Sequence, residues 1–299
     1  MKHAIDSRMI SKKEMLDLFA DAEKIRTKKS SPLKGKILAS LFYEPSTRTR
    51  LSFESAMYRL GGSVISTENA RESSSIVKGE SIEDTIRVIA HYADVVVMRH
   101  FEEGSADRAA RVSAIPIINA GDGVGQHPTQ ALLDLYTIWR ERGSIDNLSL
   151  AIIGDLKNGR TVKSLLWALS QFKDIHATLV SPKALRLPTA ILDELAETSL
   201  VLKETDRLDS ILPLADIVYQ TRIQKERFPT IKEYEKYKSC YKIDEKLART
   251  MKKGALLLHP LPRVDEIAPE VDRLPQAAYF RQAENGLYLR SALLKHLLL

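Results

Sequence analysis

The octet Tyr-Glu-Pro-Ser-Thr-Arg-Thr-Arg at residues 43–50 carries the clearest chemistry in this chain of 299 residues. It lies between an apolar run at 36–42, typical of a buried strand, and a segment with apolar residues at helical spacing that ends near Gly61. Hydroxyl and guanidinium groups at a helix start, with its free backbone N–H groups, predict a site for a phosphate-like anion. A capped helix start with solvated arginines is the plainer alternative. Five consecutive Ser, Thr and Arg residues favour the anion site.

Polar side chains also follow the other predicted strands. Arg99 comes after the strand at 94–98, and His127 and Gln130 come after the strand at 116–119. The strand at 147–154 is followed by Arg160, and the strand at 216–221 by Arg222 and Gln224. Taken singly, each is consistent with an ordinary surface residue. Because ligands of open α/β sheets bind outside the carboxyl ends of strands, the recurrence favours one site for a small polyanion.

Strands and helices alternate along the whole chain, which predicts an α/β protein with mainly parallel sheets flanked by helices. The alternation occurs in two sets joined by a long helix at about 128–142, so we expect two domains, at 1–135 and 145–285, with the active site in the cleft between them. The apolar segment 286–299 predicts a C-terminal helix starting near Gly286, which we expect to pack back on the first domain. Ser11 and Glu14 predict a capping box at the start of a helix over 11–27.

The composition limits the class of protein. A hydrophobic content of 44% and a charged content of 28% are typical of a soluble globular protein. No apolar run approaches the roughly 18 residues that span a membrane, and the first residues lack the apolar core of a signal peptide, so we expect a cytoplasmic protein without membrane contact. Cys240 is the only cysteine, and the seven histidines are scattered, so we expect neither a disulfide, a metal site nor a cofactor.

A net charge of +6 and a pI of about 9.2 raise the alternative of a non-catalytic protein that binds nucleic acid or another polyanion. Basic and acidic residues are interleaved throughout, and only 6% of residues are aromatic. This pattern argues against a nucleic-acid partner and for arginines that serve a small anionic substrate.

Seven motifs then occur in a fixed order: YEPSTRTR, SSSIVKGES, VVVMRH, NAGDGVGQHPTQALLDL, GDLKNGR, TRIQKER and HPLPRVDEI. With them, the chain resembles the aspartate/ornithine carbamoyltransferase family over nearly its whole length. Ornithine-type members usually carry a cysteine in the last motif and a Ser-Met-Gly loop. This chain has Leu261 after Pro260 and no Ser-Met-Gly, which favours aspartate as the acceptor; ornithine or another amine stays the alternative.

The resemblance implies transfer of the carbamoyl group from carbamoyl phosphate to L-aspartate in pyrimidine biosynthesis. It implies that residues 1–135 bind carbamoyl phosphate and residues 145–285 bind aspartate. The residues that it assigns to carbamoyl phosphate are Ser46, Thr47, Arg48, Thr49, Ser74, Lys78, Arg99, His127, Gln130 and Leu261, the last through its backbone. The residues that it assigns to aspartate are Lys78, Arg160, Arg222 and Gln224.

Within this set, the catalytic residues implied are Arg48, Thr49, Arg99 and His127. The resemblance also implies a homotrimer in which Ser74 and Lys78 reach into the site of a neighbouring subunit. In the family, regulation depends on a separate zinc-containing chain, and the sequence leaves open whether such a partner binds. A homologue that has lost its activity is a weaker alternative, because every residue required by the motifs is present.

Overall fold

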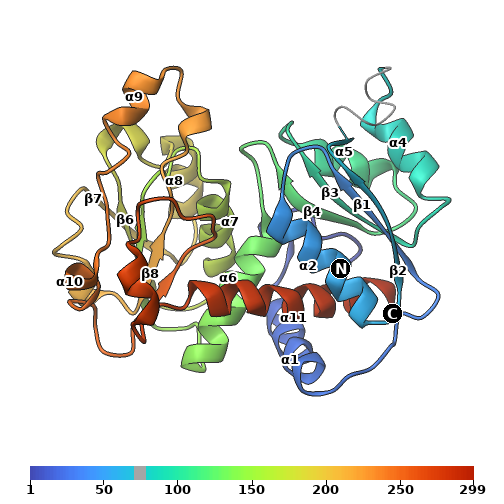
Figure 1. Ribbon diagram of the computed structural model, residues 1–299, viewed down its shortest axis with the longest axis horizontal. Helices are drawn as coiled ribbons and strands as arrows, with labels where there is room; N and C mark the ends of the chain where they lie inside the picture. Colours follow the sequence, from blue (N-terminus) through green and yellow to red (C-terminus); the bar gives the residue numbers. More distant parts are fainter. Residues whose placement is uncertain (71–78) are drawn as a thin grey trace. The chain divides into compact units, whose positions relative to one another are not determined.

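The computed structural model describes residues 1–70 and 79–299, which form two compact units (Figure 1). Unit 1 consists of Met1–Tyr136 and Ala283–Leu299, and unit 2 consists of Thr137–Gln282. The chain passes from unit 1 to unit 2 within helix α6 (Pro128–Arg142) and returns within helix α11 (Tyr279–Leu298).

Unit 1 contains a parallel sheet of four strands in the order β2-β1-β3-β4. Its elements in chain order, before α6, are α1 (Lys12–Thr27), β1 (Ile37–Phe42), α2 (Thr47–Arg59), β2 (Ser63–Glu68), α4 (Ile82–Ile89), β3 (Val95–His100), α5 (Ser105–Val112) and β4 (Ile117–Asp122).

Alternate residues of β1 serve the two faces of this sheet. Ala39 and Leu41 belong to an apolar cluster that includes residues of α4 and α5. Ser40, between them, points the other way, and its Oγ donates a hydrogen bond of 2.9 Å to Glu54 of α2. Helices therefore cover both faces, as a parallel sheet requires.

Unit 2 contains a parallel sheet of five strands in the order β7-β6-β5-β8-β9. Its elements in chain order are β5 (Leu148–Ile153), α7 (Arg160–Leu169), β6 (Ile175–Val180), α8 (Thr189–Ala196), β7 (Val201–Thr205), β8 (Ile217–Gln220), α9 (Ile231–Glu235), α10 (Glu245–Ala248) and β9 (Leu256–Leu258). On one face of the sheet, Ile153, Val218 and Leu257 belong to a buried apolar cluster that also includes Tyr279 of α11.

The predicted fold class is confirmed, since each unit is a parallel sheet flanked by helices. The predicted capping box is also present, with the Ser11 side chain accepting from the Glu14 backbone and the Glu14 side chain accepting from the Ser11 backbone.

The predicted start of the C-terminal helix is wrong. Helix α11 begins at Tyr279, seven residues before Gly286. A Cβ at Gly286 would lie 3.0 Å from Nη1 of Arg290 and 3.1 Å from Leu133. The glycine thus makes room inside the helix, and does not begin it.

The turn after β5 depends on Gly154. Its φ is +118°, and an added Cβ would lie 2.4 Å from the carbonyl oxygen of Thr221 at the end of β8. Both the backbone conformation and the close approach therefore exclude a side chain.

We expect Gly154→Ala to lower the free energy of unfolding by about 2–4 kcal/mol, because it adds a clash with backbone to an unfavourable φ. Gly254→Ala is a matched control, since Gly254 also has a positive φ, +78°, but nothing lies within 4 Å of its Cβ position. The control should lose only about 1 kcal/mol. Urea unfolding of both variants measures the difference, and equal losses would contradict the role given to the Thr221 contact.

Candidate active site

The strand order of unit 1 reverses between β1 and β3. After β1 the chain adds β2 on one side, then returns to add β3 on the other side of β1. In this register Phe42 lies beside Arg99, and the Tyr43 N–H donates to the Arg99 carbonyl at 2.9 Å. Such a reversal leaves a crevice outside the carboxyl ends of the two strands, where ligands of this class of sheet bind.

Helix α2 begins in this crevice. Ser46 is its N-cap residue, but among the described residues its side chain makes no capping hydrogen bond. Its hydroxyl instead accepts a hydrogen bond of 3.2 Å from Nη1 of Arg99. Thr47 and Arg48 are exposed, and Thr49 is buried in the first turn. The start of α2 therefore combines backbone N–H groups, hydroxyls and two guanidiniums, which suits an anion.

Arg99 is held on a second side by Glu44, whose Oε2 lies 3.4 Å from Nε of Arg99. The two residues come from the ends of the two strands at the reversal, β1 and β3. The guanidinium is thus partly fixed before any ligand binds, which reduces the cost of ordering it.

His127 and Gln130 lie at the start of α6, and both are buried. The Gln130 side chain donates a hydrogen bond of 2.7 Å to Asp134 one turn further along the helix. The loop that leads to His127 is organised by Asp122 at the end of β4. Its carboxylate accepts from the Gln126 N–H at 2.9 Å, the Gly104 N–H at 2.8 Å and the Asn119 side chain at 2.9 Å.

Unit 2 repeats the reversal, this time between β5 and β8. The Thr221 N–H donates to the Ile153 carbonyl at 2.8 Å, so the two strand ends are joined. Arg160 is the first residue of α7 after β5, and Arg222 and Gln224 follow β8. The reversal therefore brings the two predicted aspartate-binding loops to neighbouring strand ends.

A buried carboxylate, Asp155, connects these loops. It accepts hydrogen bonds from the backbone and side chain of Asn158, at 3.0–3.1 Å, and from the backbone N–H of Gln224. Burial raises the pKa of Asp155, and these hydrogen bonds oppose the rise. Asp155 thus holds the turn before Arg160 and the backbone at Gln224 in one arrangement.

Leu261 lies in a tightly bonded turn after β9. Its φ is +53°, an unfavourable conformation for a residue with a side chain, and its N–H donates to Nδ1 of His259 at 2.7 Å. The neutral ring then carries its proton on Nε2, which lies 2.7 Å from Oε1 of Glu266. The other oxygen of Glu266 accepts from the backbone N–H groups of Val264 and Asp265, both at 3.1 Å.

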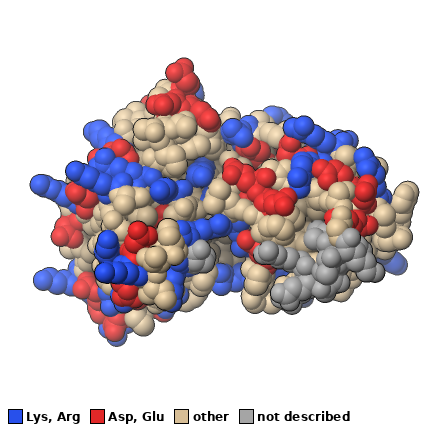
Figure 2. Space-filling model, turned by 90° about the horizontal axis from the view of Figure 1, so that it is seen from above, with Lys and Arg blue, Asp and Glu red and all other residues tan. Residues whose placement is uncertain are grey.

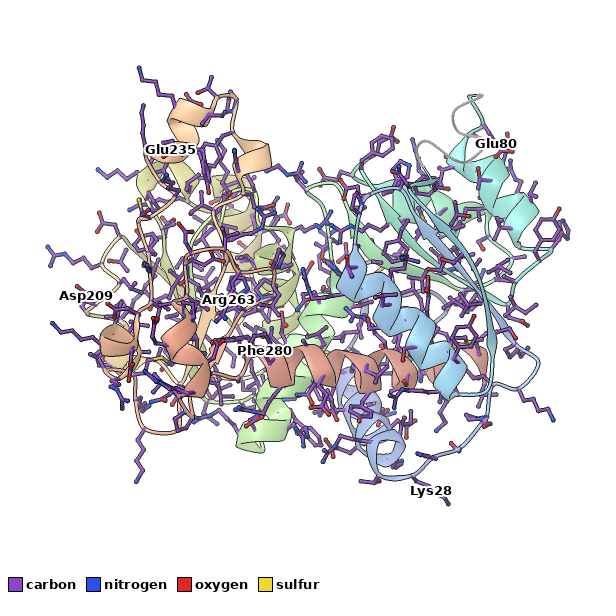
Figure 3. The ribbon with its side chains drawn as sticks, in the orientation of Figure 1. Lys28, Glu80, Asp209, Glu235, Arg263 and Phe280 are labelled. Atoms are coloured by element: carbon purple, nitrogen blue, oxygen red, sulfur yellow. The ribbon has the colours of Figure 1, made fainter. Side chains whose placement is uncertain are left out.

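Burial acts to raise the pKa of Glu266, but the hydrogen bond from His259 and those from the backbone N–H groups outweigh it, so the pKa lies below its ordinary value. Further along the same turn, Arg263 pairs with Asp272 and lies over the rings of Tyr279 and Phe280, 5.3 and 5.6 Å from their centroids. Figure 3 labels Arg263 and Phe280 in unit 2. The turn that carries the Leu261 carbonyl is therefore fixed at both ends.

Two predicted site residues, Ser74 and Lys78, lie outside the described residues. Within residues 1–70 and 79–299, no group of three or more His, Cys, Asp or Glu side chains is suited to a metal ion. In the same part of the chain, no helix is long and apolar enough to cross a membrane. On the face drawn in Figure 2, basic and acidic side chains are intermixed.

Sequence reasoning missed the carboxylates that position the site, namely Asp122, Asp155 and Glu266. Each lies inside a motif that was singled out for other residues. A signal existed for Asp122 and Asp155, since each follows a predicted strand beside a glycine, where an Asp side chain often bonds nearby backbone N–H groups.

Two parallel α/β units that each gather arginines and polar donors at a reversal of strand order define an enzyme for small anionic substrates. Two family models match the chain. The aspartate/ornithine carbamoyltransferase carbamoyl-P binding domain matches residues 2–140, and the Asp/Orn binding domain of the same family matches residues 146–297. The chain belongs to the aspartate/ornithine carbamoyltransferase family.

Individual relatives of the chain are named as carbamoyltransferases that act on aspartate. The chain is 53% identical to the aspartate carbamoyltransferase catalytic subunit of Methanocaldococcus jannaschii, covering 100% of this chain and 98% of the relative. It is also 53% identical to the chloroplastic aspartate carbamoyltransferase of Arabidopsis thaliana, covering 98% of this chain and 75% of the relative. A solved Trypanosoma cruzi aspartate transcarbamoylase in complex with N-(phosphonacetyl)-L-aspartic acid is 40% identical, with a TM-score of 0.91, covering 100% of this chain and 96% of that structure.

Glu266→Gln tests the pair that fixes the Leu261 turn. The folded pKa of Glu266 lies below its ordinary value of 4.5, so the carboxylate stabilises the fold above that pH, and this contribution is lost as pH falls through the folded pKa. At pH 7 we expect the free energy of unfolding of the variant to be about 1–3 kcal/mol lower than that of the wild type. This difference should shrink below about pH 4.5. Urea unfolding from pH 7 to pH 3.5 measures it. A difference independent of pH would contradict the ionised state of Glu266.

Proposed function

We propose that this chain transfers the carbamoyl group of carbamoyl phosphate to the amino group of L-aspartate, giving N-carbamoyl-L-aspartate and phosphate in pyrimidine biosynthesis. The observation that carries the proposal is the hydrogen bond from Arg99 to Ser46 at the start of α2, where the first strand reversal gathers donors for a phosphorylated substrate. The identity of 53% to enzymes named aspartate carbamoyltransferase supports the acceptor.

Carbamoyl phosphate binds to unit 1. Ser46, Thr47, Arg48 and Thr49 hold its phosphate, using the N–H groups and dipole of α2 as well as their side chains. Thr49, Arg99 and His127 donate to the carbonyl oxygen and stabilise the negative charge that develops on it. Gln130 and the Leu261 carbonyl orient the carbamoyl amide.

Aspartate binds to unit 2. Its two carboxylates pair with Arg160 and Arg222, and Gln224 adds a neutral donor. The amino nitrogen attacks the carbamoyl carbon, a new C–N bond forms, and the C–O bond to phosphate breaks with its electron pair on the leaving oxygen. The phosphate is the base that accepts the proton of the amine. Transfer therefore needs the side chains of both units and no side-chain nucleophile.

The active assembly is a homotrimer in which Ser74 and Lys78 complete the site of a neighbouring subunit, with Lys78 contacting both substrates. Exposed apolar side chains on α2 and the edge strand β2, namely Leu51, Tyr58 and Ile65, support a surface between copies of the chain.

The single cysteine supports a reducing compartment, and we place the enzyme in the cytoplasm, although the Arabidopsis relative is named chloroplastic. The name of the Methanocaldococcus relative, a catalytic subunit, leaves room for a separate regulatory chain.

The first test offers carbamoyl phosphate with aspartate or ornithine in parallel and measures carbamoylated product. We expect product from aspartate alone, because a cationic acceptor side chain is repelled by Arg222. Arg99→Ala should lower kcat by about 10²–10³-fold through loss of one donor to the developing oxyanion. Arg108→Ala is the control, since this arginine pairs with Glu102 and Glu83 outside the site and should keep wild-type turnover. Product from ornithine alone would overturn the aspartate assignment.

The second test concerns the assembly. Analytical ultracentrifugation of the wild type should give three times the chain mass of 33.6 kDa. Ile65 is 40% exposed on edge strand β2. Its substitution Ile65→Glu should shift the mass towards the monomer and lower the activity in parallel, because a charge at an apolar contact is costly. Val201→Glu, at a residue 42% exposed on edge strand β7 of unit 2, is the control and should stay trimeric. A wild-type monomer with full activity would rule out shared sites.

A further inference from the structure

Arg290 is a buried cation in the C-terminal helix α11, with only 4% of its surface exposed. Its Nη1 donates a hydrogen bond of 2.6 Å to Oγ of Ser52, and its guanidinium lies over the ring of Phe53, 5.1 Å from the centroid. Both partners belong to α2, the helix whose first turn forms the predicted phosphate site. An arginine in such a position is unusual, since burying a charge is costly.

A short chain of hydrogen bonds leads from Arg290 to the predicted site. The Ser52 hydroxyl that accepts from Arg290 donates in turn to the carbonyl oxygen of Thr49, at 2.9 Å. Two hydrogen bonds therefore connect the guanidinium to the backbone of a residue in the first turn of α2. A hydroxyl that accepts from a cation becomes a stronger donor, so the contact with the Thr49 backbone is reinforced.

Arg290 also interacts electrostatically with Asp134 of α6. Burial lowers the pKa of Arg290 to about 10, the negative charge of Asp134 opposes this shift, and the positive charge of Arg48 adds to it. Asp134 is itself buried and accepts the hydrogen bond of 2.7 Å from Gln130. Arg290 thus interacts electrostatically with one predicted site residue, Arg48. It is connected to a second, Gln130, through Asp134, which accepts the hydrogen bond of Gln130.

The space for this side chain is built into the sequence. A Cβ at Gly286, one turn earlier in α11, would lie 3.0 Å from Nη1 of Arg290 and 3.1 Å from Leu133 of α6. The absence of a side chain at Gly286 therefore allows α11 and α6 to pack around the guanidinium, at the cost of a glycine inside a helix.

We propose that Arg290 is a positioning residue of the carbamoyl phosphate site, which fixes the first turn of α2 through Ser52 and the side chain of Gln130 through Asp134. This inference rests on the proposed function. The alternative is a purely structural role, in which Arg290 ties three helices together without effect on the ligand. The two differ in what a substitution does to ligand affinity in a chain that stays folded.

The experiment compares Arg290→Met, which keeps most of the volume, Arg290→Lys, which keeps the charge, and Ser52→Ala, which removes the connecting hydroxyl. Titration calorimetry with inorganic phosphate reports the site directly, without turnover. We expect the Kd for phosphate to rise about 10- to 100-fold in Arg290→Met and severalfold in Ser52→Ala, with partial recovery in Arg290→Lys. The KM for carbamoyl phosphate should rise and kcat fall, while the KM for aspartate stays within about threefold.

Lys295→Met is the control, because Lys295 lies on the same helix and pairs with Asp21 of α1 at 3.3 Å, away from α2. It should keep the wild-type Kd. Wild-type phosphate affinity in folded Arg290→Met would overturn the proposal; if that variant does not fold, an unchanged Kd in Ser52→Ala would do so. A wild-type chain that binds phosphate but forms no carbamoylated product would overturn the proposed function, and the phosphate titrations would still decide the role of Arg290.

Discussion

The candidate site depends on one topological constraint, the reversal of strand order that occurs once in each sheet. Between β1 and β3, and again between β5 and β8, neighbouring parallel strands are followed by loops that leave in opposite directions. The diverging loops leave a crevice outside these strand ends, where the free N–H groups in the first turn of the next helix remain available to a ligand. Every described residue predicted to bind a substrate, except those on β4–α6 and Leu261, follows one of these four strands or, as Arg99 does, lies at the end of one.

Loops that follow the strands have little apolar surface with which to fix themselves, and buried carboxylates hold several of the loops that carry predicted site residues. Asp122, Asp155 and Glu266 each accept hydrogen bonds from two backbone N–H groups, at least one of them in a loop that carries a predicted site residue. A carboxylate has about four acceptor positions and can therefore join several donors that face one point. The cost of burying the charge is offset by these hydrogen bonds, and the result is a backbone that is ordered before the substrate arrives.

Much of the fold could be predicted because its signals are local. The alternation of elements indicated the fold class, Ser11 and Glu14 indicated the capped start of α1, and Pro128 marked the first residue of α6. The motifs pointed to residues that do lie at strand ends, although their individual roles stay predictions. The start of α11 was missed because the reason for Gly286 is a contact with Arg290 and Leu133, and Leu133 is far away in the sequence. Arg290 was missed for the same reason, since nothing in the pattern of an apolar helix shows which arginine is buried.

Electrostatics connects these observations. Arg99, Arg50 and Arg290 each have a carboxylate near them, from Glu44, Glu54 and Asp134. A partner of this kind weakens the field of a guanidinium at the substrate, but it fixes the direction of the donors in the absence of one. At 3.4 Å, the Arg99–Glu44 and Arg50–Glu54 contacts are looser than an ideal charge-assisted hydrogen bond, so an anion that binds at Arg99 as proposed needs to displace only a weak contact. The arrangement thus favours preorganisation over maximal positive charge, and preorganised donors are what stabilise a developing oxyanion without further rearrangement.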